Sequence, residues 1–195
     1  MENKYKKLNL IKKNVFNAKE AKKIGLDYYD LKVLVKENLL QKSARGIYQK
    51  KSSSSYEDES LQNALVHLGE KSCICLLSAF SYYELTDEIP EKVWAYVPIN
   101  KFSHLESIKV VRKRDPKWNI GIINKNGVII TNIDRTVIDA LSDRKHVTLA
   151  DSFKIAKIAL LNKMTTLKNL VLMAKKLGVY KRVKLNLTLL QDEYV

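Results

Sequence analysis

The chain has 195 residues, of which 46% are hydrophobic and 29% charged, a composition typical of a globular protein that buries a core as one domain or two small ones. A formal net charge of +14 and a pI near 9.6 favour polyanions or anionic surfaces as partners. The sequence contains no run of about 18 apolar residues, and its Lys-rich start lacks the apolar segment of a signal peptide. A membrane protein and a secreted protein are therefore not expected.

Cys73 and Cys75 are the only cysteines, two positions apart in an apolar run. This spacing suits neither a mutual disulfide nor a four-ligand zinc site. We expect buried thiols in a reducing cytoplasm, and we predict no metal and no cofactor.

The first 50 residues hold the densest positive charge and predict a compact helical unit. Residues 2–13 form an expected leading helix. Asn17 can cap a short second helix whose third residue is Glu20, and Gly25 ends that helix. Asp27 can cap a third helix that runs to about Asn38. On a helical wheel this third helix has an apolar face and a polar face.

The third helix would pack its leucine face inward and expose its other face. Leu31, Leu34 and Val35 fall on the first face, whereas Tyr29, Lys32, Val33 and Lys36 fall on the second and Tyr28 lies at the edge. Residues 39–43 and 47–50 then predict a β-hairpin with Gly46 in its turn. Helix, turn, helix and hairpin in this order predict a winged helix-turn-helix. A small helical subdomain with solvated lysines is the alternative.

A winged helix would bind double-stranded DNA through the exposed face of its recognition helix and the tip of its wing. Tyrosine hydroxyls and lysines can bind phosphates or base acceptors, and a valine can contact a thymine methyl group. The predicted DNA-binding residues are Tyr28, Tyr29, Lys32, Val33, Lys36, Lys19, Lys42 and Arg45.

Residues 51–56 are serine-rich and predict a linker between a DNA-binding domain at 1–52 and a second domain at 57–195. The second domain should mix helices and strands and end in helices, which makes the whole chain α+β. Expected helices cover residues 58–68, 78–85 (capped by Ser78), 134–141 (capped by Asp134), 148–162 and 165–177, and expected strands cover 93–97, 108–112, 121–124 and 128–131. Residues 183–190 suit a strand or a docked tail.

Arg112, Lys113, Arg114 and Arg135 are candidates for a basic surface of the second domain. For Arg135 there is a structural alternative, an ion pair with Asp139 one helical turn later. Enzyme motifs are weak: Asp115-Pro116-Lys117 imitates the end of a nuclease motif, but the proline would break the required strand. His67, His104 and His146 show no metal-ligand spacing.

Several stretches together resemble the AbiEi family, the antitoxins of bacterial abortive-infection toxin–antitoxin pairs. The resemblance covers residues 15 to about 142, and it is carried by Ala18-Lys19-Glu20-Ala21, Ile24-Gly25-Leu26, Leu39-Leu40, Arg45-Gly46-Ile47-Tyr48, Leu77 to Thr86, Ile89-Pro90 and Thr131-Asn132-Ile133-Asp134-Arg135-Thr136-Val137-Ile138-Asp139.

The resemblance implies a winged helix that represses its own operon, joined to a domain that counteracts a nucleotidyltransferase-like toxin without a stable complex. This antitoxin would act in phage defence and would not be an enzyme. The residues themselves leave two other functions open: a winged-helix transcription factor with a ligand-sensing second domain, and a nucleic-acid-processing enzyme.

Overall fold

The computed structural model describes residues 3–51 and 56–192, and it divides into two compact units. Unit 1 comprises residues 1–71 with 125–128, and unit 2 comprises 72–124 with 129–195. The predicted linker is centred on residues 52–55, which lie outside the described part of the chain. The predicted domain boundary therefore stays a prediction.

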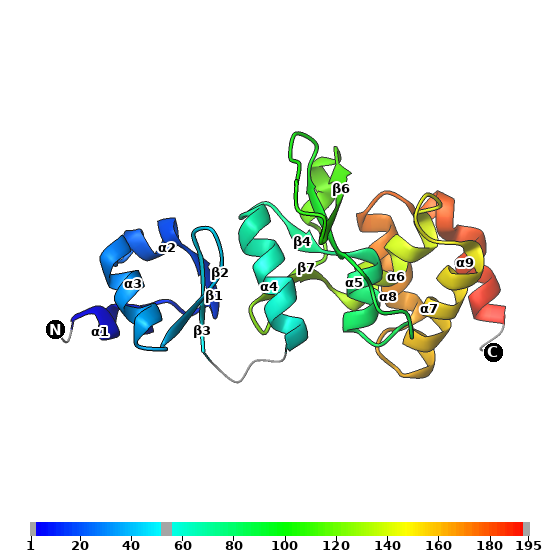
Figure 1. The fold of residues 1–195 in the computed structure, drawn as a ribbon. Helices are drawn as coiled ribbons and strands as arrows, with labels where there is room; N and C mark the ends of the chain where they lie inside the picture. Colours follow the sequence, from blue (N-terminus) through cyan, green and yellow to red (C-terminus); the bar gives the residue numbers. More distant parts are fainter. Residues whose placement is uncertain (1–2, 52–55, 193–195) are drawn as a thin grey trace. The chain divides into compact units, whose positions relative to one another are not determined.

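Unit 1 combines short helices with a small antiparallel sheet (Figure 1). In the sheet, β3 lies between β1 and β2. The elements are α1 (Asn3–Leu10), β1 (Val15–Asn17), α2 (Ala18–Lys23), α3 (Tyr28–Lys36), β2 (Leu40–Ala44), β3 (Ile47–Lys50) and α4 (Tyr56–Leu68).

The predicted order of helices and hairpin in the first 50 residues is found, with one addition. The predicted helices begin where their capping residues place them, after Asn17 and after Asp27. The added element is β1, whose Val15 pairs with Gln49 of β3. A strand of three residues is too short to show an alternating pattern, and so the sequence did not predict it.

The core of unit 1 is formed by α1, α2, α3 and the sheet. Leu8, Leu31 and Leu34 are buried with Phe16 and Tyr48. The rings of Phe16 and Tyr48 stack with centroids 6.2 Å apart. The leucine face of α3 thus packs inward as predicted, and this fixes which face of the helix remains outside.

Unit 2 contains a five-stranded mixed sheet in the order β6-β5-β4-β8-β7. β4 pairs antiparallel with β5 and parallel with β8, and β5 pairs parallel with β6. The strands are β4 (Cys73–Ile74), β5 (Val93–Pro98), β6 (Ile108–Lys113), β7 (Ile122–Lys125) and β8 (Val128–Thr131), and the 3₁₀ helix η1 (Pro116–Asn119) follows β6. The four predicted strands are present within a residue of their expected ends.

Helix α6 is the centre of the helical part of unit 2. It contacts α5, α7, α8 and α9, which gather around it in Figure 1. Every residue from 135 to 141 is buried, as expected for a helix covered on all sides. The helices are α5 (Leu76–Tyr82), α6 (Ile133–Ser142), α7 (Leu149–Leu161), α8 (Leu167–Lys176) and α9 (Tyr180–Asp192).

Two predicted helix caps are wrong. Ser78 lies inside α5, and its buried hydroxyl accepts a hydrogen bond of 2.9 Å from the backbone N–H of Trp94. Asp134 lies in the first turn of α6, where its carboxylate accepts a hydrogen bond from the Thr165 hydroxyl. The cap of α6 is Asn132, whose side chain accepts from the N–H of Arg135 at 2.9 Å. Both helices begin before the polar residue that the sequence predicted as their cap: α5 begins at Leu76 and α6 at Ile133.

The strand considered for residues 183–190 is also wrong, because the segment belongs to α9. Val183, Asn186, Leu187 and Leu190 are its buried residues, and their spacing of three and four is helical. Together the units form a mixed α+β protein. None of the helices in the described ranges 3–51 and 56–192 combines the length and apolarity needed to cross a bilayer.

Candidate nucleic-acid interface

Helix α3 is fixed at its N-terminus by a reciprocal capping box. The Asp27 carboxylate accepts from the N–H of Asp30 at 2.8 Å, and the Asp30 carboxylate accepts from the N–H of Asp27 at 3.2 Å. These bonds satisfy free backbone donors of the first turn. With Leu31 and Leu34 buried, the helix is held at its end and along one face.

The opposite face of α3 is exposed. Tyr28 is 71% exposed and Tyr29 72% exposed, values unusual for large aromatic side chains. Lys32 and Lys36 are also exposed, and Val33 is half-buried beside them. The structure therefore places all five predicted residues of this helix on one face, where the two tyrosines and the two lysines are exposed.

The hairpin of β2 and β3 presents the remaining predicted residues of the wing. Lys42 on β2 and Arg45 in the turn are both exposed. The turn is tied to α2, because the carbonyl of Gly46 accepts a hydrogen bond of 2.8 Å from the N–H of Ala18. Lys19, the next residue along α2, is exposed as well. This hydrogen bond fixes the position of the turn, and with it the backbone of Arg45, relative to α2.

Acidic side chains near α3 are already engaged. The carboxylate of Glu37 accepts from Lys4 Nζ at 3.1 Å and from the Tyr5 hydroxyl at 2.9 Å. The hydrogen bond from Lys4 is the main reason that the pKa of Glu37 lies below its ordinary value. Asp30 is bound in the capping box. Carboxylates beside this face would repel phosphates, but the ion pair with Lys4 compensates the charge of Glu37.

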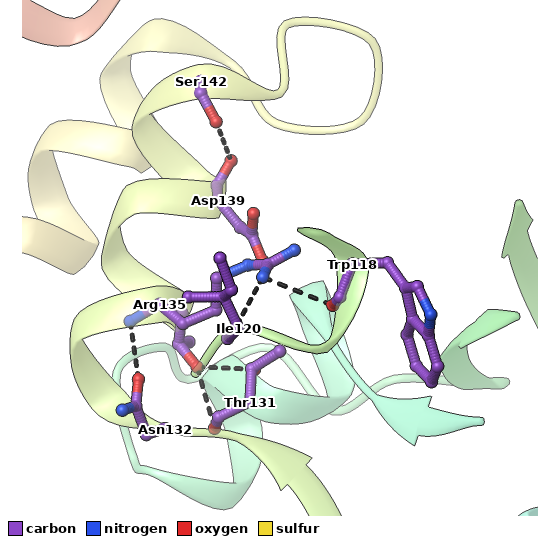
Figure 2. A network of polar contacts seen from close by, with 8 residues as sticks. Trp118, Ile120, Thr131, Asn132, Arg135, Asp139 and Ser142 are labelled. Atoms are coloured by element: carbon purple, nitrogen blue, oxygen red, sulfur yellow. Dashed lines mark hydrogen bonds and ion pairs between the residues drawn. The ribbon is translucent and has the colours of Figure 1, made fainter. Parts of the chain in front are cut away.

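Of the four residues predicted for a basic surface in unit 2, Arg135 is not on the surface. It is only 3% exposed, and its Nε donates to the Asp139 carboxylate at 2.7 Å. Its Nη1 donates to the backbone carbonyls of Ile120 and Trp118 (Figure 2). The predicted ion pair with Asp139 is confirmed, and the prediction of Arg135 as a surface residue is wrong because α6 is covered on all sides.

The other three predicted cations lie at the end of β6. Arg112 and Arg114 are exposed, and Arg112 lies over the ring of Phe102 at 4.6 Å. Lys113 lies over the ring of Tyr96 at 4.1 Å and lines a cavity of about 540 Å³ in unit 2. The structure brings Lys113 together with Arg135 at this cavity, and Arg112 and Arg114 are not among its lining residues.

The cavity is also lined by Arg144, Lys145 and Arg182, which the sequence analysis did not identify, and by Lys117, which it considered only as part of a weak nuclease motif. They come from η1, from the segment after α6 and from α9. Their positions in the sequence carried no signal, because segments so far apart converge only through the packing of helices.

Both cysteines are free and buried, as predicted. Burial raises the pKa of the Cys73 thiol to about 12, and the thiolate is therefore absent at neutral pH. Within the described residues, no group of three or more His, Cys, Asp or Glu side chains is arranged to hold a metal ion.

No family model matches the chain, and no curated protein matches it.

Proposed function

We propose that unit 1 is a winged helix-turn-helix that binds double-stranded operator DNA. Helix α3 would be the recognition helix, and the hairpin of β2 and β3 the wing. The observation that carries this proposal is the face of α3, where two tyrosines more than 70% exposed stand with Lys32 and Lys36 on a helix whose other side is buried.

The dimensions and chemistry of α3 support this role. Nine residues at about 1.5 Å each give a helix about 14 Å long, comparable with a major groove about 12 Å wide. Lysine and tyrosine side chains donate to phosphates and base edges, and the exposed part of Val33 can meet a thymine methyl group. Arg45 at the tip of the wing suits a narrow minor groove.

We further propose that the protein is a non-enzymatic antitoxin that represses its own abortive-infection operon. It would counteract a nucleotidyltransferase-like toxin without forming a stable complex with it. This part is supported by the resemblance of its motifs to the AbiEi family. The network around Arg135 and Asp139 gives the last of those motifs a structural role in the core of unit 2.

A second candidate function is a winged-helix transcription factor that senses a ligand through unit 2. The specific observation that favours it is the cavity of about 540 Å³, a volume within the ordinary range of ligand sites.

The DNA-binding proposal is tested by Lys32→Ala with Lys36→Ala. We expect this double variant to lose specific binding to a labelled duplex from upstream of its gene, measured by fluorescence anisotropy. Lys168→Ala with Lys176→Ala removes the same charge from exposed positions of α8 and is the matched control. Equal affinities of the two double variants would refute the assignment of α3.

The antitoxin proposal is tested by co-expression with a nucleotidyltransferase-like protein encoded beside it. The Lys32→Ala and Lys36→Ala variant should still rescue growth, because neutralisation is assigned to unit 2. If the variant lost both DNA binding and the rescue of growth, the assignment of these two activities to separate units would be contradicted. Cleavage of duplex DNA by the purified protein with magnesium or manganese would overturn the non-enzymatic assignment.

A further inference from the structure

The cavity of about 540 Å³ lies entirely within unit 2, where four separate parts of the chain meet. Its lining comes from the end of β6, from η1, from α6 with the segment that follows it, and from the region of α8 and α9. Six lining side chains are cationic (Lys113, Lys117, Arg135, Arg144, Lys145 and Arg182) and three are carboxylates (Asp115, Asp139 and Asp143). The lining thus has an excess of positive charge.

The carboxylates of the lining have partners of their own. Asp139 is paired with Arg135 at 2.7 Å. Asp143 accepts from the backbone N–H of His146 at 3.2 Å, and its carboxylate lies 3.0 Å from Nδ1 of the same residue. Asp115 accepts from the N–H of Lys117 at 2.7 Å and caps η1. In the part of the chain that the structure describes, none of these carboxylates forms an ion pair with Lys117, Arg144, Lys145 or Arg182.

Four of the cations have no side-chain partner among the residues that the structure describes: Lys117, Arg144, Lys145 and Arg182. Like charges gathered around a concavity repel one another, and they focus a positive potential that attracts anions. Arginine side chains in such a site can bind phosphate oxygens in a bidentate manner. A multiply charged anion would therefore relieve the repulsion and satisfy these donors.

An aromatic side chain accompanies the cations. Trp118 lines the same cavity and is half-buried. Its backbone carbonyl accepts from Arg135, whereas its indole ring points away from that contact (Figure 2). An indole that lines a cavity together with cationic side chains offers a surface on which a nucleobase can stack, and stacking accepts any base.

We propose that this cavity binds a nucleotide, with Arg144, Arg182 and the neighbouring lysines on its phosphate groups and Trp118 against its base. The volume matches a ligand of this size. The nucleotide could be free or the 5′-phosphorylated end of an RNA chain, since both carry the same groups. The inference does not depend on the proposed DNA binding, which concerns only unit 1.

The test is isothermal titration of the full-length protein with ATP and UTP. The double variant Arg144→Ala with Arg182→Ala should bind both at least about tenfold more weakly, a difference of about 1.4 kcal/mol. Lys168→Ala with Lys184→Ala removes the same charge outside the cavity and should change affinity less than about twofold. Equal losses in the two variants would overturn the assignment, as would the absence of binding to the unmodified protein.

Two further titrations complete the test. Inorganic triphosphate should bind more weakly than ATP, and Trp118→Leu should abolish that difference; equal binding of the two ligands by the unmodified protein would refute base stacking. A 5′-triphosphorylated RNA trinucleotide distinguishes the two sources of the ligand. Tighter binding of this RNA than of ATP would assign the cavity to RNA ends, and tighter binding of ATP would assign it to free nucleotides. Circular dichroism verifies that each variant is folded.

The DNA-binding variant separates this inference from the proposed function. Lys32→Ala with Lys36→Ala should bind ATP as the unmodified protein does. Loss of nucleotide binding in this variant would place the nucleotide on unit 1 and overturn the inference, whatever the outcome for DNA.

Discussion

Arg135 is the residue whose role the sequence left most open. Its ion pair with Asp139 could be predicted, because a separation of four residues places two side chains together on any helix. Its burial could not, since that depends on α5, α7, α8 and α9 covering α6. The guanidinium also binds the carbonyl of Ile120, and it thereby joins α6 to the segment before β7.

We expect Arg135→Met to destabilise the protein by about 3–5 kcal/mol, because it leaves the Asp139 carboxylate buried without its cation. Arg135→Met with Asp139→Leu should be less destabilised than the single variant, since no uncompensated charge remains. Urea unfolding followed by circular dichroism measures both. A double variant less stable than the single one would mean that the pair itself is a large source of stability.

At the scale of secondary structure, the first 50 residues were predictable because their signals are local. Asn17 and Asp27 cap helices within three residues of themselves, and the leucine face of α3 repeats within one element. Helix α9 was not predictable in this way. Its apolar residues suit a strand as well as a helix, and the contacts with α6, α7 and α8 decide between them.

Gly121 is a second feature that the sequence alone could not assign. Its φ is +73°, and a Cβ added there would lie 2.8 Å from Cβ of Arg135 and 3.2 Å from Oδ1 of Asn132. Gly178, in the same unit, has a φ of +72° with no atom within 4 Å of an added Cβ. The two glycines share a backbone conformation and differ in the space around them.

Gly178→Ala should cost about 1–2 kcal/mol for the left-handed backbone alone. Gly121→Ala should cost clearly more, because the alanine Cβ must also displace α6. Urea unfolding measures the loss of stability in each variant. The loss in Gly121→Ala minus the loss in Gly178→Ala is the cost of the steric clash with α6. Equal costs would mean that the segment before β7 moves away from α6 without penalty.

On the scale of the whole molecule, part of the positive charge behind the net value of +14 gathers at two separate places. One is the exposed face of α3 with the wing, and its residues lie close together in the sequence. The other is the cavity of unit 2, whose Lys113, Arg144 and Arg182 are far apart along the chain. The first site could be predicted from residue order, and the second required the three-dimensional structure.

The affinity for DNA should fall steeply with salt. If Arg45 and about six lysines each neutralise one phosphate, log affinity plotted against log salt has a slope of about −6. Lys32→Ala with Lys36→Ala should reduce the slope by about 2, measured on nonspecific duplex where binding persists. An unchanged slope would show that these lysines do not contact phosphates.

The capping box of α3 limits how this helix can approach a duplex. The carboxylates of Asp27 and Asp30 occupy amides at the positive end of the helix, which in many proteins receive a phosphate directly. In the proposed complex, end-on docking of α3 against the DNA backbone would bring these two carboxylates close to a phosphate, which is unfavourable. The DNA-binding proposal therefore requires α3 to enter a groove along its exposed face, which carries Lys32 and Lys36 beyond the capped first turn.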